Sequence, residues 1–127
     1  MGTAAQKLIL TIDLGTSGPK VALFTERGNL IDAAFRPCDL ILLPDGGAEQ
    51  DPDQWWHAIC EAAGEVLDRQ KSLRKQVVAV GCTSQWSGTV AIDKSGQHLM
   101  NAIIWMDTRG SPHVKRAMDG LVRVQGY

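Results

Sequence analysis

The sequence predicts an α/β domain built on a mixed sheet, with an antiparallel meander of three strands, a crossover helix and a buried parallel strand. Three observations support this. Short β-rich runs separated by turn residues occupy the first 35 residues. A stretch with apolar residues at helical spacing follows, and after it comes an almost continuous apolar run, which is typical of a strand buried on both faces. A right-handed crossover would place that last strand beside the first.

Composition narrows the class of protein. The chain has 127 residues, of which 44% are hydrophobic and 21% charged, as expected for one soluble globular domain. The net charge of −1 gives no electrostatic basis for binding nucleic acid or a membrane surface. No apolar run reaches transmembrane length. The cysteines (Cys38, Cys60 and Cys82) lack zinc-ligand spacing, so we expect them to be reduced and buried in a cytoplasmic protein.

The first predicted hairpin joins two apolar runs, 8–12 and 21–24, through a turn rich in glycine and hydroxyl side chains. Glycine lets the backbone approach a ligand closely, and hydroxyl and backbone N–H groups are donors suited to an anionic oxygen. The turn therefore predicts a phosphate site. Its expected phosphate-binding residues are Gly15, Thr16, Ser17 and Lys20.

Asp13 comes directly before this turn. A carboxylate beside a bare phosphate would repel it, but Mg²⁺ binds carboxylate and phosphate oxygens together. Asp13 is therefore the candidate metal ligand. The alternative is a polar hairpin turn in which the aspartate only accepts hydrogen bonds from loop amides.

The middle of the chain supplies the rest of the predicted sheet. A third strand is expected over 30–35, a loop over 39–48, and a helix from the N-cap Asp51 to about Gln70, with Trp55 and Trp56 packed in the core. A basic bend over 71–76 leads into the apolar strand 77–82.

A second polar loop, 83–88, follows that strand. Ligands of open α/β sheets bind at the carboxyl ends of strands, so this loop should lie at the same edge as the phosphate turn. The amide, indole and hydroxyl of Gln85, Trp86 and Ser87 suit a polyol, because they can bond OH groups and pack on C–H faces. The alternative is a polar turn in which Trp86 caps the core.

The last part of the chain predicts a hairpin with strands 89–93 and 98–105, followed by Asp107 and Arg109. This acid and base could bond sugar hydroxyls or simply pair with other loops. Ser111-Pro112 is typical of the start of a helix.

The run Asp13-Leu14-Gly15-Thr16-Ser17 with Lys20, together with residues 83–88 and 102–109, resembles the FGGY family of carbohydrate kinases, xylulokinases included. The likeness spans roughly 8–110 and implies a ribonuclease-H-like (actin-like ATPase) domain that binds ATP and Mg²⁺. It also implies that Gln85, Trp86, Ser87 and Asp107 contact the sugar. Gly18-Pro19 departs from the family pattern, and Trp86-Ser87 matches neither the Arg-Glu of glycerol kinases nor the Met-His of xylulokinases.

The resemblance implies transfer of the γ-phosphoryl group of ATP to a sugar or polyol hydroxyl, such as that of a xylulose-like pentulose. Residues 1–127 would be the N-terminal part of the first kinase domain, with no catalytic residue among them, because the family's catalytic base lies further along. The chain alone is expected to be inactive. Its partners would be a small sugar or polyol and the remainder of the kinase chain, with a homodimer left open. The alternatives are a chaperone-type nucleotide domain and a non-catalytic scaffold or regulatory domain of the same fold.

Overall fold

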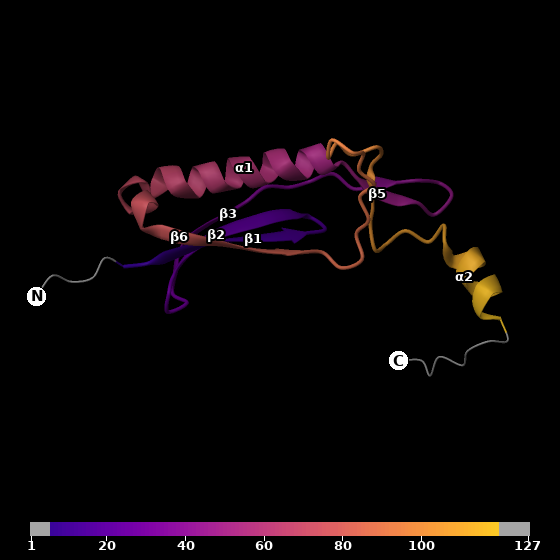
Figure 1. Cartoon of the computed structure of the whole chain (residues 1–127), viewed down its shortest axis with the longest axis horizontal. Helices are drawn as coiled ribbons and strands as arrows, with labels where there is room; N and C mark the ends of the chain where they lie inside the picture. The colour runs from indigo at the N-terminus through magenta and orange to yellow at the C-terminus, as the bar shows by residue number, and fades with distance from the viewer. Residues whose placement is uncertain (1–5, 120–127) are drawn as a thin grey trace, which may run out of the picture.

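The computed structural model of the chain describes residues 6–119, and its largest unit is a four-stranded sheet in the order β3-β2-β1-β6 (Figure 1). β1 (Leu8–Gly15) pairs antiparallel with β2 (Gly18–Thr25), and β2 pairs antiparallel with β3 (Leu30–Phe35). β6 (Val77–Ser84) runs parallel to β1. The predicted meander and parallel return strand are confirmed.

The helix α1 (Pro52–Arg69) covers one face of this sheet. Asp51 caps it by accepting a hydrogen bond from the backbone N–H of Asp53 at 2.9 Å, and proline occupies the first turn, as predicted. Side chains of β1, β2 and α1 form the core between helix and sheet. These residues are Leu8, Leu10, Val21, Leu23, Ala62 and Val66.

The burial predicted for β6 is wrong. The strand is at the edge of the described sheet, and the side chains of Val78 and Val80 are 61% and 63% exposed. β6 is exposed because α1 packs mainly on β2 and β3 and does not cover β6. An apolar run identifies a strand suited to burial, but it does not supply the layer that would bury it.

The core predictions for the tryptophans and cysteines also need correction. Trp56 is 65% exposed, because the buried stripe of α1 is Ala58, Ala62 and Val66, and a residue two positions before Ala58 lies on the opposite side of the helix. Trp55 is partly buried. All three cysteines are free, but two are exposed and the third is only partly buried.

A second, smaller sheet lies beyond the amino end of α1, in the order β4-β5-β7. β4 (Ile41–Leu42) and β5 (Ala48–Gln50) fall in and just after the stretch predicted as a loop, and β7 (Ala102–Ile103) pairs antiparallel with β5. Strands of two or three residues carry no detectable sequence period, so the sequence does not predict this sheet.

The hairpin predicted over 89–105 is reduced to β7 and two isolated bridges, Thr89 with Ile103 and Ile92 with His98. The basic bend is a 3₁₀ helix, Lys71–Gln76, and the predicted last helix is α2 (Ser111–Met118). Within residues 6–119, no helix is long and apolar enough to cross a bilayer.

Candidate functional site

The two predicted binding loops lie side by side. β1 and β6 are parallel neighbours in register up to Leu14 and Ser84, so both strands end at the same edge of the sheet. The first residue after β6 continues this pairing, because the backbone N–H of Gln85 donates to the carbonyl of Leu14 at 2.7 Å. The phosphate turn (residues 15–18) and the sugar loop (residues 83–88) thus meet at one edge, as the sequence predicts.

Thr16 is the direct link between the two loops. Its hydroxyl donates to Oε1 of Gln85 at 3.1 Å and accepts from the indole Nε1–H of Trp105 at 2.9 Å. A hydroxyl has a single proton, and here that proton is directed at Gln85. Thr16 was predicted to offer this proton to a phosphate, and in this structure it instead joins the turn to the sugar loop.

Gln50 completes the network, although the sequence does not predict it as a site residue. Its side chain is fully buried. Its amide nitrogen donates to the backbone carbonyls of Thr16 at 2.8 Å and Asp39 at 3.1 Å, and its Oε1 accepts from Nε2 of Gln85 at 2.8 Å. The only available signal was a polar amide directly before a helix cap, which by itself does not indicate burial.

The charged groups of the hairpin lie close to the turn. Asp13 and Lys20 are paired across β1 and β2, with Nζ of Lys20 3.5 Å from Oδ2 of Asp13. Both side chains are at least half exposed, and Ser17 is exposed as well. This set places a carboxylate and an ammonium on the strands beside a hydroxyl in the turn, which suits a phosphate and a hard divalent cation.

The departure at Gly18-Pro19 has a packing explanation. Gly18 has φ +129°, a conformation that favours glycine, and a Cβ there would lie 2.0 Å from the carbonyl oxygen of Arg36. Pro19 is buried, and its carbonyl accepts the backbone N–H of Arg36 at 3.2 Å. Gly18-Pro19 thus fits the turn closely against the segment after β3.

Most of the sugar loop is exposed, Trp86 and Ser87 included, and only Gln85 is partly buried. Trp86 is 79% exposed, so the alternative in which it caps the core is wrong. Ser87 has φ 52°, in the left-handed region. Behind the loop lies a cavity of about 270 Å³. It is lined by Leu14, Trp55, Ser84, Gln85, Gly88 and Val90.

Asp107 is held by neighbouring loops. Its carboxylate accepts the backbone N–H of Ala48 at 3.0 Å and the Nε–H of Arg109 at 2.8 Å, and Arg109 also pairs with Glu49 at 2.7 Å. The hydrogen bond from Arg109 is the largest cause that lowers the pKa of Asp107 to about 2. Hydrogen bonds to Asp107 and Glu49 in turn raise the pKa of Arg109. The geometry favours pairing between loops over a free sugar ligand at this position.

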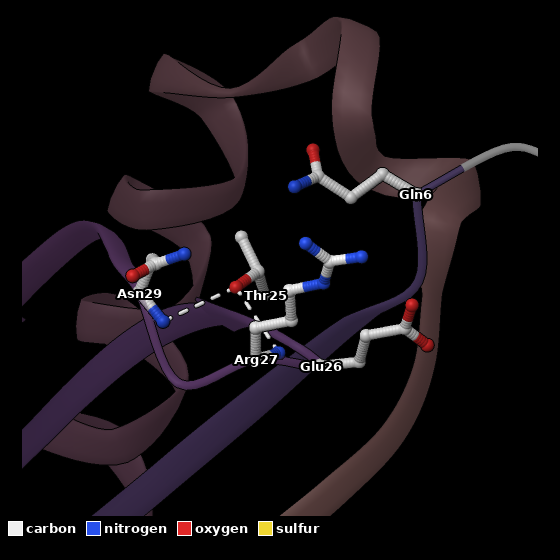
Figure 2. A pocket seen from close by; sticks show the side chains of 5 residues that line it. All are labelled: Gln6, Thr25, Glu26, Arg27 and Asn29. Carbon is white, nitrogen blue, oxygen red and sulfur yellow. Dashed lines mark hydrogen bonds between the residues drawn. The ribbon is translucent and has the colours of Figure 1, made fainter. Parts of the chain in front are cut away.

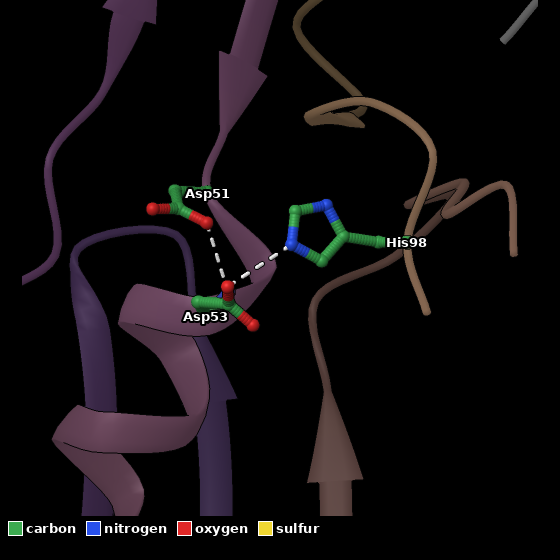
Figure 3. Close-up of side chains that lie close together, drawn as sticks. All are labelled: Asp51, Asp53 and His98. Carbon is green, nitrogen blue, oxygen red and sulfur yellow. Dashed lines mark hydrogen bonds and ion pairs between the residues drawn. The ribbon is translucent and has the colours of Figure 1, made fainter. Parts of the chain in front are cut away.

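Two other polar clusters lie outside this network. His98 approaches Oδ2 of Asp53 at 3.2 Å, next to the helix cap Asp51 (Figure 3), and hydrogen bonding to Asp53 is the main cause that raises the pKa of His98. Asp51 is engaged in the helix cap, and Asp53 and His98 pair with each other, so each of these three side chains has a structural partner. A hollow of about 310 Å³ lies at the other end of the strands (Figure 2). Gln6, Thr25, Glu26, Arg27 and Asn29 line it.

Fold and loops together define a ribonuclease-H-like domain of the actin-like ATPase class. The sequence pattern of the FGGY family of carbohydrate kinases, N-terminal domain, matches residues 8–123, and the chain belongs to this family. This match agrees with the kinase resemblance rather than with the chaperone-type alternative.

Individual relatives agree with the family. A xylulose kinase from Staphylococcus epidermidis is 32% identical over 114 residues, which are 90% of this chain and 23% of that protein. The structure of a xyloylose kinase from Brucella ovis is 30% identical with a TM-score of 0.82, over 87% of this chain and 23% of its own. The structure of Plasmodium falciparum glycerol kinase with ADP is 25% identical with a TM-score of 0.83, and the match covers 96% of this chain and 25% of that kinase. The chain thus spans about a quarter of these relatives.

Proposed function

We propose that residues 1–127 are the N-terminal part of the first domain of an ATP-dependent sugar or polyol kinase. The observation that carries this proposal is the 3.1 Å hydrogen bond between Thr16 Oγ1 and Gln85 Oε1, which brings the phosphate turn and the sugar loop together. The kinase activities named for the relatives support it. The reaction would move the γ-phosphoryl group of ATP to a sugar hydroxyl.

The phosphate half would consist of Gly15, Ser17, Lys20 and the backbone of Thr16, whose hydroxyl is already bonded to Gln85, with Asp13 as the magnesium ligand. The exposed hydroxyl of Ser17 and the ammonium of Lys20 suit phosphate oxygens, and the exposed carboxylate of Asp13 suits Mg²⁺. ATP would supply the phosphoryl group, with Mg²⁺ neutralising its charge. Lys20 would leave Asp13 free for the metal by turning toward the phosphate.

The sugar half would use Gln85, Trp86 and Ser87, with Asp107 at its border. The exposed indole of Trp86 offers an apolar surface for C–H groups, and the amide and hydroxyl beside it offer hydrogen bonds. A xylulose-like pentulose is the proposed substrate, with a polyol as the alternative, because the relatives include both xylulose and glycerol kinases.

Phosphoryl transfer also needs a base that takes the proton of the attacking hydroxyl. Of the two acids predicted at the site, Asp13 suits the metal and Asp107 is held by Arg109 and Ala48. We therefore propose that the base comes from the remaining part of the kinase and that the 127-residue chain alone does not turn over ATP.

A chimera tests the proposal. Residues 8–110 would replace the matching segment of the Staphylococcus epidermidis xylulose kinase, and ADP release would be followed with a panel of pentuloses and polyols. We expect sugar-dependent turnover that Asp13→Asn abolishes. The matched control, Asp68→Asn, removes an exposed carboxylate that only pairs with Arg74 and should leave turnover intact. A folded chimera that binds neither ATP nor any sugar would instead favour the non-catalytic scaffold.

A further inference from the structure

We propose that Gln50 is a positioning residue that fixes the phosphate turn and the sugar loop relative to each other. The inference rests on the proposed kinase function and deepens it. Gln50 contacts one residue of each loop, and it belongs to neither of them. It acts through Thr16 and Gln85 and not on a ligand.

The hydrogen-bonding capacity of Gln50 is almost fully used. The two amide protons go to the carbonyls of Thr16 and Asp39, and the amide oxygen accepts from Gln85. The side chain is 0% exposed, so no water replaces a lost partner. Removing a partner of a buried polar group costs more than a typical hydrogen bond contributes, and this holds the two loops in one arrangement.

The second sheet gives Gln50 a fixed base. Gln50 is the last residue of β5 and pairs with Ala102 of β7, three residues before Trp105. The indole N–H of Trp105 donates to the hydroxyl of Thr16 at 2.9 Å. Two adjacent strands therefore bring two side chains to Thr16, and the phosphate turn is held by the small sheet as well as by its own hairpin.

Geometry at this point matters for the reaction. A phosphoryl group and an attacking hydroxyl must be aligned, and a displacement of about 1 Å can cost about 100-fold in rate. Freeing the two loops from each other would misalign these groups while leaving each loop able to touch its own ligand. Loss of Gln50 should therefore lower kcat more than it raises KM.

Two substitutions and one control isolate this role. Gln50→Leu removes every hydrogen bond of the amide but keeps a side chain of similar size. Gln50→His keeps one donor and one acceptor and should restore part of the function. The control is Gln54→Leu, because the Gln54 amide also bonds Asp39, at its backbone N–H and its carboxylate, but it reaches neither loop.

The first measurement needs no activity. In the 127-residue chain, the exchange rate of the Trp105 indole proton reports whether Thr16 stays in place. Gln50→Leu should increase this rate severalfold, up to about tenfold, because the half-exposed indole loses a fixed acceptor. Gln50→His should increase it less, and Gln54→Leu should leave it unchanged. Equal rates in all variants would overturn the inference.

The second measurement uses the chimera carrying residues 8–110. Gln50→Leu should lower kcat by about 100-fold with a smaller change in KM for sugar and ATP, and Gln54→Leu should stay within about twofold. Equal kinetics for both leucine variants in an active chimera would overturn the positioning role. An inactive wild-type chimera would count against the proposed function, and the exchange rates would still decide the role of Gln50. If Gln50→Leu does not fold, the inference is tested with Gln50→His instead, and an unchanged exchange rate and kcat in that variant would overturn it.

Discussion

β2 and β6 flank β1 on opposite sides, and both are apolar, yet only β2 is buried. Val21 and Leu23 of β2 are fully buried against α1, whereas Val78 and Val80 of β6 are more than 60% exposed. β2 pairs with β1 antiparallel and β6 pairs with it parallel, but both pairings extend along almost the whole strand, so neither explains the difference in burial. What differs is the layer above them, because α1 lies across β2 and not across β6.

This difference shows that the sequence of β6 fits an environment that residues 6–119 do not provide. The strand has no proline and no charged residue, and its outer edge is unpaired within the described sheet. Natural edge strands usually carry such protecting residues. The relatives are about four times as long as this chain, so further parts of such a kinase would have room to cover this side. The predictions below test the contrast between the two strands.

The largest effect is expected in the covered strand. Leu23→Ala should lower the free energy of unfolding by about 2–5 kcal/mol, because it leaves a cavity between β2 and α1. Chemical denaturation followed by circular dichroism measures this loss. A cost below about 1 kcal/mol would mean that α1 does not pack on β2 as described.

The start of β2 should be the next most sensitive position. Gly18→Ala forces an L residue into φ +129° and brings its Cβ to the carbonyl of Arg36, so we expect a loss of about 1–3 kcal/mol or more. Gly28→Ala is the matched control, because its φ is +81° and nothing lies within 4 Å of the added Cβ. If both variants cost the same, the close approach of Arg36 has no energetic role.

The covered side should also be acid-sensitive. Arg69 of α1 bonds Asp32 of β3 and is the main cause that lowers the pKa of Asp32 from 3.8 to about 2. A lowered folded-state pKa means that Asp32 stabilises the fold above about pH 4 and that this contribution is lost as the pH falls toward 2. Asp32→Asn should therefore reduce the loss of stability between pH 5 and pH 2, measured by thermal melts across that range. An unchanged pH dependence would show that the pair with Arg69 is not formed in solution.

The smallest effect on stability is expected in the open strand. Val80→Lys should change the free energy of unfolding by no more than about 0.5 kcal/mol, because the side chain is already exposed. It should also lower self-association at high concentration, since a charge protects an unpaired edge. Sedimentation velocity and denaturation test both statements. A loss comparable with that of Leu23→Ala would place β6 in the core, as the sequence suggested.

The same contrast explains which features could be predicted. The β1–β2 hairpin, the cap at Asp51 and the helix that follows depend on residues close together in the chain, and these predictions are confirmed. The burial of β6 and of Trp56 depends on which surface lies opposite, and both predictions are wrong. Local patterns predict the longer strands and the helix α1 but not the short strands or the reduced hairpin over 89–105, and burial depends on how the elements meet.

The site follows the same rule. The meeting of the phosphate turn with the sugar loop could be predicted, because parallel neighbouring strands end at one edge. The hydrogen bonds of Thr16 with Gln85 and Trp105 could not be predicted, because these residues lie 69 and 89 positions from Thr16 in the sequence. The buried amide of Gln50 was missed for the same reason.

The most direct test of the paired loops is a nuclear Overhauser contact in the 127-residue chain, between the backbone amide proton of Gln85 and the α protons of Gly15. The backbone N–H of Gln85 donates to the carbonyl of Leu14, the residue before Gly15, at 2.7 Å, and this predicts a strong contact. A folded chain in which this contact is missing would place the two loops apart and contradict the shared kinase site.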